Sequence, residues 1–330
     1  MLIPEYTITP RTLQNISTVE YARAVIDTTK ILPTWQKQLQ KEAVTNTFFY
    51  SLKLQGINIK LETVKKTVDK LSTSSLQEIA NIQKALKLTD KLLNTKKIQE
   101  NDLKSLHKML TQQILPKAKQ GIYRSTKTIS KTDPEEILAE MTQTLDWYNN
   151  EHLNEEHPII KTALLKGYLH KIMPFENLND TTANLASSFS LKQNGYDFKN
   201  YVELTEYLFT THKEFQIQVK LLASRDPDFT KWIEYFTEGL AIKANNVMEK
   251  VLLLAKDTKI AKASGRVQLS PRQEKLVAFL QDYGQLQNRD FARLYPNRSE
   301  DTVLRDLKVL MDRGIVVKRG STKSSRYVLK

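Results

Sequence analysis

The stretch HKIMPFENLNDTTANLA, residues 170–186, decides how the middle of this chain folds. It predicts a helix that breaks at Pro174, a polar loop, and a second helix that follows at once. A loop that leads into a helix presents backbone amides to anions such as phosphate. Yet the loop contains no Gly, Arg or His, so the side chains that usually accompany a phosphate site are missing.

Helical spacing dominates the chain on both sides of this loop, and nine Gly and ten Pro in 330 residues interrupt it rarely. Period-two alternation occurs over residues 122–129, which predicts a short strand or hairpin. The fold class is therefore mainly α. The predicted helices cover 17–29, 33–54, a segment starting near Lys60, 75–93, 99–114, 133–149, 158–172, 181–193, 200–223 and 228–255.

The composition is that of a globular protein, with 40% hydrophobic and 26% charged residues. No apolar run approaches the roughly 18 residues that cross a bilayer. The N-terminus lacks the basic and apolar segments of a secretory signal, and a chain without Cys forms neither disulfides nor thiolate metal sites. We expect a cytoplasmic protein with no membrane partner and no metal centre.

Positive charge gathers at the C-terminal end. The chain carries a formal charge of +13, and residues 265–330 hold nine Arg and five Lys against seven acidic residues, an excess of seven. Such a surplus favours an anionic partner. Residues 256–269 lose helical periodicity and gather Lys, Ser and Gly, as linkers do.

Residues 270–330 predict a winged helix-turn-helix: three short helices followed by two β-prone runs around a Gly/Ser/Lys turn. In such a module the third helix enters the major groove of DNA and the hairpin reaches the phosphates. Glu300 and Asp301 weaken the positive face, and winged helices also dock on proteins. The expected DNA contacts are Arg298, Ser299, Thr302 and Arg305 from the helix and Lys318, Arg319, Lys323, Ser325 and Arg326 from the hairpin.

Residues 15–255 resemble the Fic (filamentation-induced-by-cAMP) family with its N-terminal helical extension, whose members mostly transfer AMP from ATP to a hydroxyl of a target protein. Ser51, Gln55 and Gly56 stand where the extension's inhibitory motif has Ser, Glu and Gly. GIYRSTKTI, residues 121–129, is similar to the flap that holds a target segment as an added strand. The resemblance implies an extension over 1–110, a Fic-like core with a short β-hairpin flap over 111–255, and flap residues Tyr123, Arg124, Ser125, Thr126 and Lys127.

The opening stretch falls on the family's signature, His-Pro-Phe-x-Asp/Glu-Gly-Asn-Gly-Arg-x-x-Arg. Pro174, Phe175 and Asn179 match it. The other positions differ: Met173 replaces His, Asn177 replaces the acid unless Glu176 takes that role, Leu178 and Asp180 replace Gly, and Thr181 and Asn184 replace the two Arg.

Each replacement has a chemical consequence. The family's His is the general base, and a thioether cannot accept a proton in its place. Leu178 and Asp180 bring bulk and negative charge to the phosphate region, and Thr181 and Asn184 lack the charge of guanidinium. Asn177 is a weaker Mg²⁺ ligand than a carboxylate. His170, one helical turn before Met173, is the nearest alternative base, although a packed histidine is the simpler reading of it.

Two classes of function fit these residues. The first is a DNA-binding transcription regulator with an inactive Fic-like body, in which Asn179, Thr181 and Thr182 retain nucleotide binding in one variant. The second is an AMP transferase that uses ATP with Mg²⁺ through divergent groups and holds its target protein on the flap. Because winged helices commonly bind DNA in pairs, we expect a homodimer.

Overall fold

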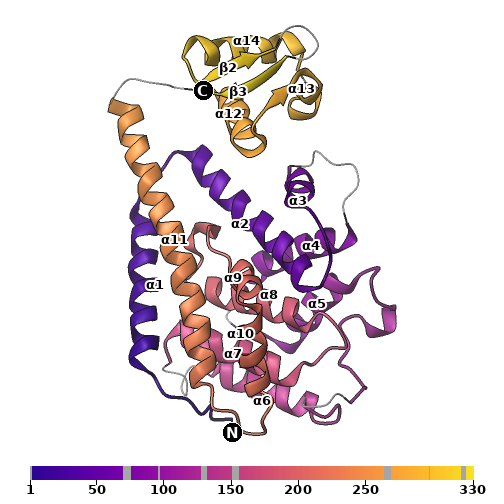
Figure 1. Cartoon of the computed structure of the whole chain (residues 1–330). Coiled ribbons are helices and arrows are strands. Elements are labelled where there is room, and N and C mark those ends of the chain that lie inside the picture. Colours follow the sequence, from indigo (N-terminus) through magenta and orange to yellow (C-terminus); the bar gives the residue numbers. More distant parts are fainter. Residues whose placement is uncertain are drawn as a thin grey trace.

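The computed structural model describes residues 2–69, 76–95, 97–127, 132–150, 156–263, 269–296, 298–320 and 325–330. These residues form a helical body and a smaller C-terminal module, and the mainly α fold class is confirmed (Figure 1). The helices of the body are α1 (Pro10–Thr28), α2 (Pro33–Leu54), α3 (Leu61–Val68), α4 (Gln77–Leu92), α5 (Glu100–Thr111), α6 (Ile137–Asn149), α7 (Pro158–Ile172), α8 (Asn179–Gln193), α9 (Thr205–Thr210), α10 (His212–Leu221) and α11 (Thr230–Ala263), with short 3₁₀ turns η1 (Lys117–Lys119) and η2 (Phe198–Asn200).

Helices α7 and α8 lie inside the body and carry the loop between them. α7 reads PIIKTALLKGYLHKI, which is apolar on nearly every face, and a helix of that kind is buried on all sides. Gly167 allows the closest packing of α7, since a Cβ there would lie 2.8 Å from both Phe229 and Trp232. The central loop is therefore held by two rigid, enclosed helices.

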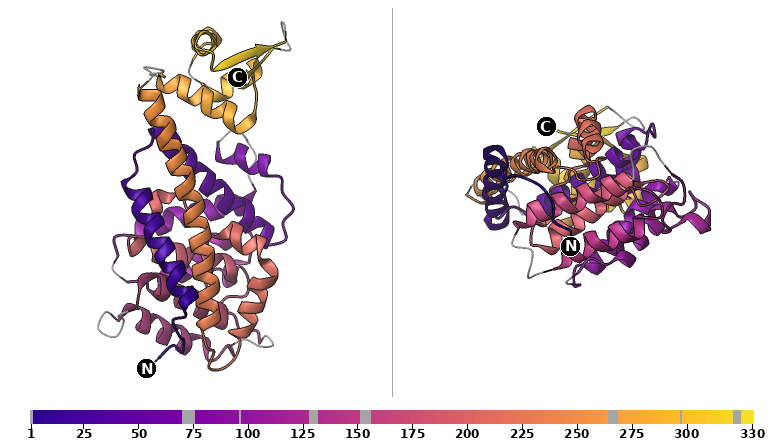
Figure 2. Two further views of the ribbon diagram at one scale, coloured as in Figure 1. Left: turned by 60° about the vertical axis from the view of Figure 1, so that its left-hand side comes forward. Right: turned by 90° about the horizontal axis from the view of Figure 1, so that it is seen from below.

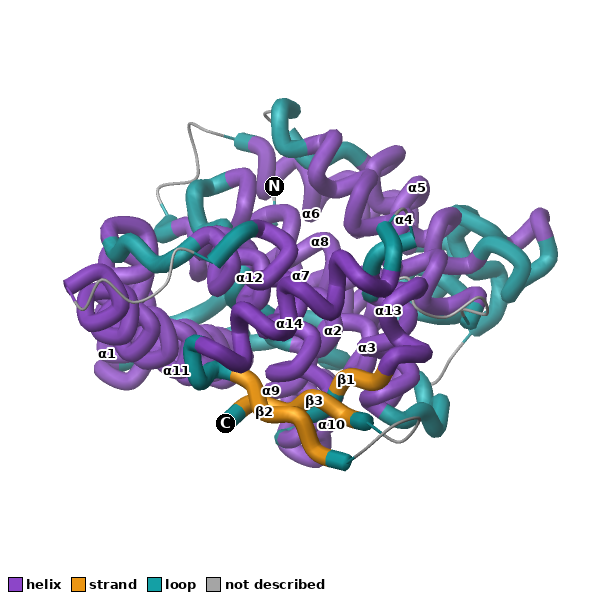
Figure 3. The backbone as a smooth tube through the Cα atoms, turned by 90° about the horizontal axis from the view of Figure 1, so that it is seen from above, coloured by secondary structure: helices purple, strands orange, loops and turns teal. Residues whose placement is uncertain are grey.

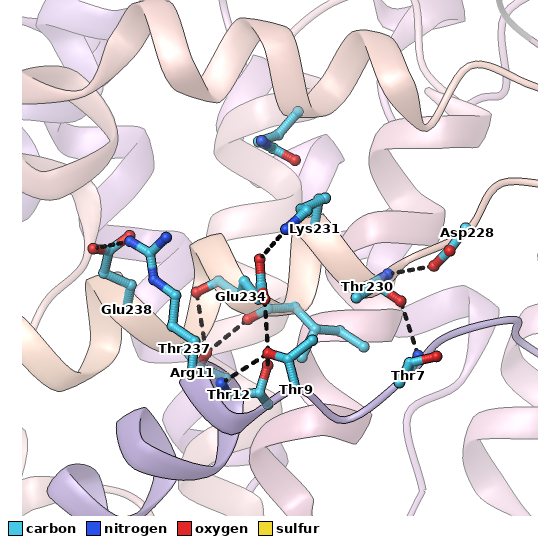
Figure 4. A network of polar contacts seen from close by, with 12 residues as sticks. Thr7, Thr9, Arg11, Thr12, Asp228, Thr230, Lys231, Glu234, Thr237 and Glu238 are labelled. Carbon is cyan, nitrogen blue, oxygen red and sulfur yellow. Dashed lines mark hydrogen bonds and ion pairs between the residues drawn. The ribbon is translucent and has the colours of Figure 1, made fainter.

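The first and last helices of the body, α1 and α11, lie side by side along one edge of it (Figure 2). Their N-terminal ends are joined by a polar network in which the hydroxyl of Thr9 donates to Glu234 at 2.7 Å and Arg11 pairs with Glu238 at 2.6 Å (Figure 4). Thr9 also caps α1, because its Oγ1 accepts from the N–H of Thr12. This polar network holds the N-terminal end of α1 against α11.

Close packing of α11 on α9 makes Gly239 sensitive to substitution. A Cβ on Gly239 would lie 2.5 Å from the ring of Tyr207. We expect Gly239→Ala to lower the free energy of unfolding by about 1–3 kcal/mol, because overpacking outweighs the better helix propensity of Ala. Urea unfolding with Gly239→Ala, Tyr207→Leu and the double variant measures this, and the double variant should lose less than the sum of the two. A more stable Gly239→Ala protein would contradict the packing.

Several predicted element boundaries need correction. The first helix begins at Pro10 rather than at 17, since Thr9 and Pro10 form a helix start. The helix expected from 133 begins at Ile137, after a turn closed by the Glu136 N–H on the Asp133 carbonyl. The helix expected over 200–223 is broken, because the carboxylate of Glu203 caps a new helix at Thr205.

The strand predicted over 122–129 is reduced, among the residues described here, to one antiparallel bridge between Tyr123 and Phe175. Residues 128 and 129 lie outside the described part. The N–H of Arg124 donates to the carbonyl of Pro174 at 2.9 Å, so this segment pairs with the chain's own central loop. The flap and the loop therefore form one connected unit.

The C-terminal module has its own core, built around Leu276, Leu280, Phe291, Leu307 and Leu310. Its elements are α12 (Pro271–Tyr283), β1 (Leu286–Gln287), α13 (Asn288–Leu294), α14 (Glu300–Asp312), β2 (Val316–Arg319) and β3 (Arg326–Leu329). The strands form an antiparallel sheet in the order β1-β3-β2 (Figure 3), and β1 is too short to have been predicted. α11 continues to Ala263, well into the segment predicted as a linker.

The module touches the body through α12 and α2 (Figure 1). Lys41 of α2 lies between two carboxylates, pairing with Asp69 at 2.7 Å and with Asp282 of α12, and the hydroxyl of Tyr283 donates to Asp69. We call Lys41, Asp69, Asp282 and Tyr283 the α2–α12 latch. It connects the helix that precedes Gln55 directly to the C-terminal module.

Among the described residues, no helix combines the length and the apolar character that spanning a bilayer requires.

Candidate functional site

The loop between α7 and α8 is held in an unusual backbone conformation. Met173 ends α7 with a φ of 43°, and Leu178 precedes α8 with a φ of 54°. Left-handed conformations cost a non-Gly residue about 1–3 kcal/mol unless the surroundings enforce them. The path of the loop is therefore imposed by its contacts rather than by its own sequence.

Asn179 supplies the first of these contacts. Its Oδ1 accepts from the N–H of Phe175 at 2.9 Å, and its Nδ2 donates to the carbonyl of Phe175 at 2.7 Å. The side chain is buried. Both ends of the amide thus close the loop on itself, and Asn179 does not present a donor to a nucleotide.

His107 of α5 supplies the second. Its ring stacks on Phe175 with centroids 4.0 Å apart and planes 3° from parallel. Nδ1 accepts from the N–H of Gly121 at 2.9 Å, so the proton resides on Nε2, which donates to the carbonyl of Asn177 at 3.1 Å. Burial lowers the pKa of His107 to about 4. The ring is a neutral strut between α5 and the loop.

This strut predicts acid sensitivity. The folded-state pKa of His107 lies below its unfolded value of 6.5, so its contribution to stability is complete above pH 6.5 and is lost as the pH falls toward 4. We expect a loss of about 1–3 kcal/mol across that window. His107→Gln should flatten this part of the stability profile in chemical unfolding, whereas His212→Gln, at an exposed site, should not. Parallel profiles for wild type and His107→Gln would refute the assignment.

Arg124 is the third contact, and it is directed inward. Its Nε donates to the carbonyl of Met173 at 2.9 Å, and its terminal nitrogens donate to the carbonyls of Thr126 at 2.8 Å, of Ile172 at 3.2 Å and of Thr132. The residue is 6% exposed. Its guanidinium neutralises the carbonyl end of α7 and is buried there.

Gln55 ends α2 beside the same loop. Its Nε2 donates to Oγ1 of Thr181 at 3.3 Å, and Ser51, one turn earlier, is buried. Gly56 follows with a φ of 77°, which ends the helix. The residues expected to form an inhibitory motif therefore lie near α8, which Gln55 contacts at Thr181.

Comparisons with known proteins agree on this central region. Residues 97–191 match the family model described as Fic/DOC family. They form a Fic/DOC domain. No curated protein matches the chain.

Solved structures extend the likeness of fold beyond the Fic domain. A Fic family protein from Desulfovibrio desulfuricans G20 superposes with a TM-score of 0.67 at 18% identity, over 100% of this chain and 98% of that one. A Fic domain containing signaling protein from Bacteroides thetaiotaomicron VPI-5482 gives 0.59 at 18% identity, over 75% and 98%. Fic-1 (residues 134–508) from C. elegans gives 0.59 at 15% identity, over 73% and 71%. Identities this low describe the fold alone.

The N-terminal end of α8, beside the Fic loop, carries negative charge. Asp180 lies in the first turn of α8, with its Oδ1 3.3 Å from Nδ1 of His170. His170 is fully buried between the rings of Phe215 and Trp232. A carboxylate at a helix start occupies the position that an anion would take. His170 therefore packs inside the Fic domain and does not face the loop surface as an alternative base.

The acidic side chain of the Fic loop is also paired. Glu176 accepts from Nζ of Lys119 in η1 at 2.6 Å. Among the described residues, no group of three His, Asp or Glu is arranged to hold a metal ion. ATP with Mg²⁺ does not fit this arrangement, because Asp180 adds negative charge at the start of α8, Glu176 is paired with Lys119, and Arg124 is bonded to backbone carbonyls.

Most of the remaining predicted site residues that the structure describes lie at the surface. Ser125, Thr126 and Lys127 of the flap are exposed, while Tyr123 packs on Phe175 with ring centroids 5.7 Å apart. Thr182 is buried and its hydroxyl donates to the Leu178 carbonyl. In the C-terminal module, Arg298, Ser299, Arg305, Lys318, Arg319 and Arg326 are exposed, and Thr302 is half-buried.

Two of the expected DNA contacts are not among these exposed residues. Lys323 lies outside the described residues, and Ser325 is buried, so a phosphate contact from its side chain is not supported. The sequence did not reveal the contacts of His107 and Lys119 with the loop or the inward direction of the Arg124 side chain. His107 meets Asn177 across 70 residues, and no local pattern reveals such a pair.

Proposed function

We propose that this chain is a Fic-domain regulator without AMP-transfer activity that binds DNA through its C-terminal module. One observation supports the loss of activity above all: the polar groups around the loop are used by the chain itself. Asn179 closes the loop, Arg124 binds backbone carbonyls, and Glu176 pairs with Lys119. A catalytic phosphate site needs preorganised donors that remain available to the transition state.

The proposed DNA-binding face is the N-terminal part of α14 with strands β2 and β3, in the manner of a winged helix. In Figure 1, α12 faces the body and α14 lies on the far side of the module. Arg298 and Arg305 are exposed there, and Arg272 of α12 pairs with the buried Asp306 at 2.7 Å, which fixes α14 on its support. These features favour a helix that is free to enter a major groove.

Fluorescence anisotropy of the full chain with a random double-stranded DNA pool tests this function. We expect binding whose affinity falls steeply with salt, because Lys and Arg displace counterions from phosphates. Selection from the pool should then enrich a sequence with two half-sites if the protein acts as a homodimer. Absence of binding at low salt would refute DNA binding and favour a protein-docking role for the module.

The second candidate is an AMP transferase with divergent groups, and one observation favours it: Gln55 still contacts position 181, as a guard beside a working site would. In this case the exposed flap residues 125–127 would hold a target protein. ATP labelled at the α-phosphate, incubated with the protein and cell lysate, should leave no labelled protein under the first proposal. Label that disappears on changing residues 173–184 would establish the second.

A further inference from the structure

A cavity of about 110 Å³ lies beside the Fic loop, between α2, α8 and the segment 196–205. It is lined by hydroxyl and amide side chains, two lysines, two carboxylates and several apolar residues. The lining includes Thr47, Ser51, Lys166, Asn184, Glu203 and Leu240. None of the flap residues lines it, so it is separate from the face of the loop on which Arg124 lies.

Lys166 gives the cavity its character. The residue is 1% exposed, and among the described residues no hydrogen bond or ion pair reaches its Nζ, whose nearest recorded contact is the Phe236 ring at 5.5 Å. Burial lowers its pKa to about 7, partly opposed by Asp180. A buried ammonium is costly unless it is paired, so an acceptor that enters the cavity is strongly favoured.

Acceptors of the chain face the same space. Oδ1 of Asn184 is buried and has no hydrogen-bond donor among the described residues. Glu203 lies at the other side, where burial raises its pKa and Lys243 at 3.3 Å opposes that rise. The cavity therefore offers a donor at Lys166 and an acceptor at Asn184, neither of which has a hydrogen-bond partner among the described residues.

We propose that this cavity binds a small organic acid that carries a hydrogen-bond donor next to its carboxylate, an α-hydroxy or α-amino acid of two or three carbons. The carboxylate accepts from Lys166, and the hydroxyl or ammonium group donates to Asn184. An apolar cavity of about 150 Å³ holds benzene, so about 110 Å³ suits a ligand of roughly five or six heavy atoms. Leu240 and Leu185 face its short carbon chain.

Because the cavity lies against α2, a bound ligand could control DNA binding by the C-terminal module. This step rests on the proposed function. Ala43, Thr47 and Ser51 present one side of α2 to the cavity, and Lys41 of the same helix forms the α2–α12 latch. A ligand that moves α2 would change the seating of the C-terminal module. DNA affinity would then depend on the ligand.

Calorimetry and thermal unfolding of the full chain test the site without DNA. The probes are glycolate, L-lactate, glycine and L-alanine, with glycolamide and lactamide as neutral counterparts of the same shape. We expect at least one acid to bind with a millimolar or lower Kd and to raise Tm in a concentration-dependent way, while the amides do not. Tighter binding of glycolate and L-lactate would identify the ligand as a hydroxy acid, and tighter binding of glycine and L-alanine would identify it as an amino acid.

Two variants locate the binding. Lys166→Met keeps the volume and removes the charge, and it should weaken binding by at least about tenfold. Asn184→Leu should do the same, while Lys161→Met, at a half-buried site of the same helix outside the cavity lining, should not. If no probe binds, if amides bind as well as acids, or if Lys166→Met binds normally, the proposal is wrong and the cavity holds only water.

Failure of the ligand site and failure of the proposed function give different results. A protein that binds one of the acids in calorimetry but does not bind DNA would refute the proposed function and not the ligand site. Conversely, a protein that binds DNA but none of the acids retains its function and lacks this site.

Discussion

Replacing both Arg305 and Lys318 by Ala is expected to lower the DNA affinity of the full chain by at least about 100-fold. Arg305 is exposed on α14, where under the proposed function its guanidinium would reach base edges, and such a contact is worth about 1–3 kcal/mol. Lys318 is exposed on β2, where it would meet a phosphate. The two contacts differ in kind, so their losses should add.

The single variants separate these roles. Arg305→Ala should weaken binding most on the selected sequence and relax preference at one base position. Lys318→Ala should weaken binding to all sequences alike and reduce the slope of log affinity against log salt by about 1. Anisotropy titrations at three salt concentrations measure both effects.

A charge-matched control is available on the body. Lys220 and Arg225 are exposed there, far from the module in sequence, and replacing both by Ala removes the same two charges. This control should retain nearly full affinity if binding is local to α14 and β2. Equal losses in both double variants would mean that net charge alone, and not the module, attracts DNA.

Helix positions followed from local residue patterns, and their exact ends depended on capping groups. Pro33 gave the start of α2 correctly because a first-turn proline needs no partner for its nitrogen. The helix predicted over 200–223 began too early, since the carboxylate of Glu203, which caps the start of α9 at Thr205, lies outside any periodic pattern. Caps are single contacts, and periodicity does not reveal them.

The sequence predicted which segments form the candidate site but not the long-range contacts that hold the loop in place. The resemblance of Ser51, Gln55 and Gly56 to an inhibitory motif implied a position near the central loop, and the Gln55–Thr181 contact agrees with that position. Arg124 was expected on a flap that faces a target, yet it crosses to the carbonyl of Met173, 49 residues away. The direction of a long side chain depends on which carbonyls the folded chain leaves unpaired, and the sequence alone does not show these.

Restoring the catalytic histidine alone is expected to leave AMP transfer undetectable. Met173 already has a left-handed backbone, which His tolerates, so Met173→His should fold. A general base contributes about 10²–10⁴-fold by taking the proton of the attacking hydroxyl, but this step needs an ATP phosphate held beside the loop, and under the proposed function the loop holds none. Asp180 still occupies the start of α8, and Arg124 remains bonded to backbone carbonyls.

Restoring five of the six replaced signature positions, all but Asn177, is expected to produce transfer at least about 100-fold above background. The variant combines Met173→His, Leu178→Gly, Asp180→Gly, Thr181→Arg and Asn184→Arg, which returns the base, the space and the cations together. Each charge-stabilising donor is worth about 10²–10³ in rate, so partial restorations should remain silent. Transfer of the labelled α-phosphate group to protein is the measurement.

Matched variants make the result decisive. The same four changes around the loop with Met173→Ala should be inactive, and adding Gln55→Glu to the active variant should suppress it, because a carboxylate at the end of α2 would pair with a restored arginine of α8. Transfer by the wild type or by Met173→His alone would show that the present loop already binds ATP productively. In that event the inward bonds of Asn179 and Arg124 must open during turnover, and the chain would be an enzyme.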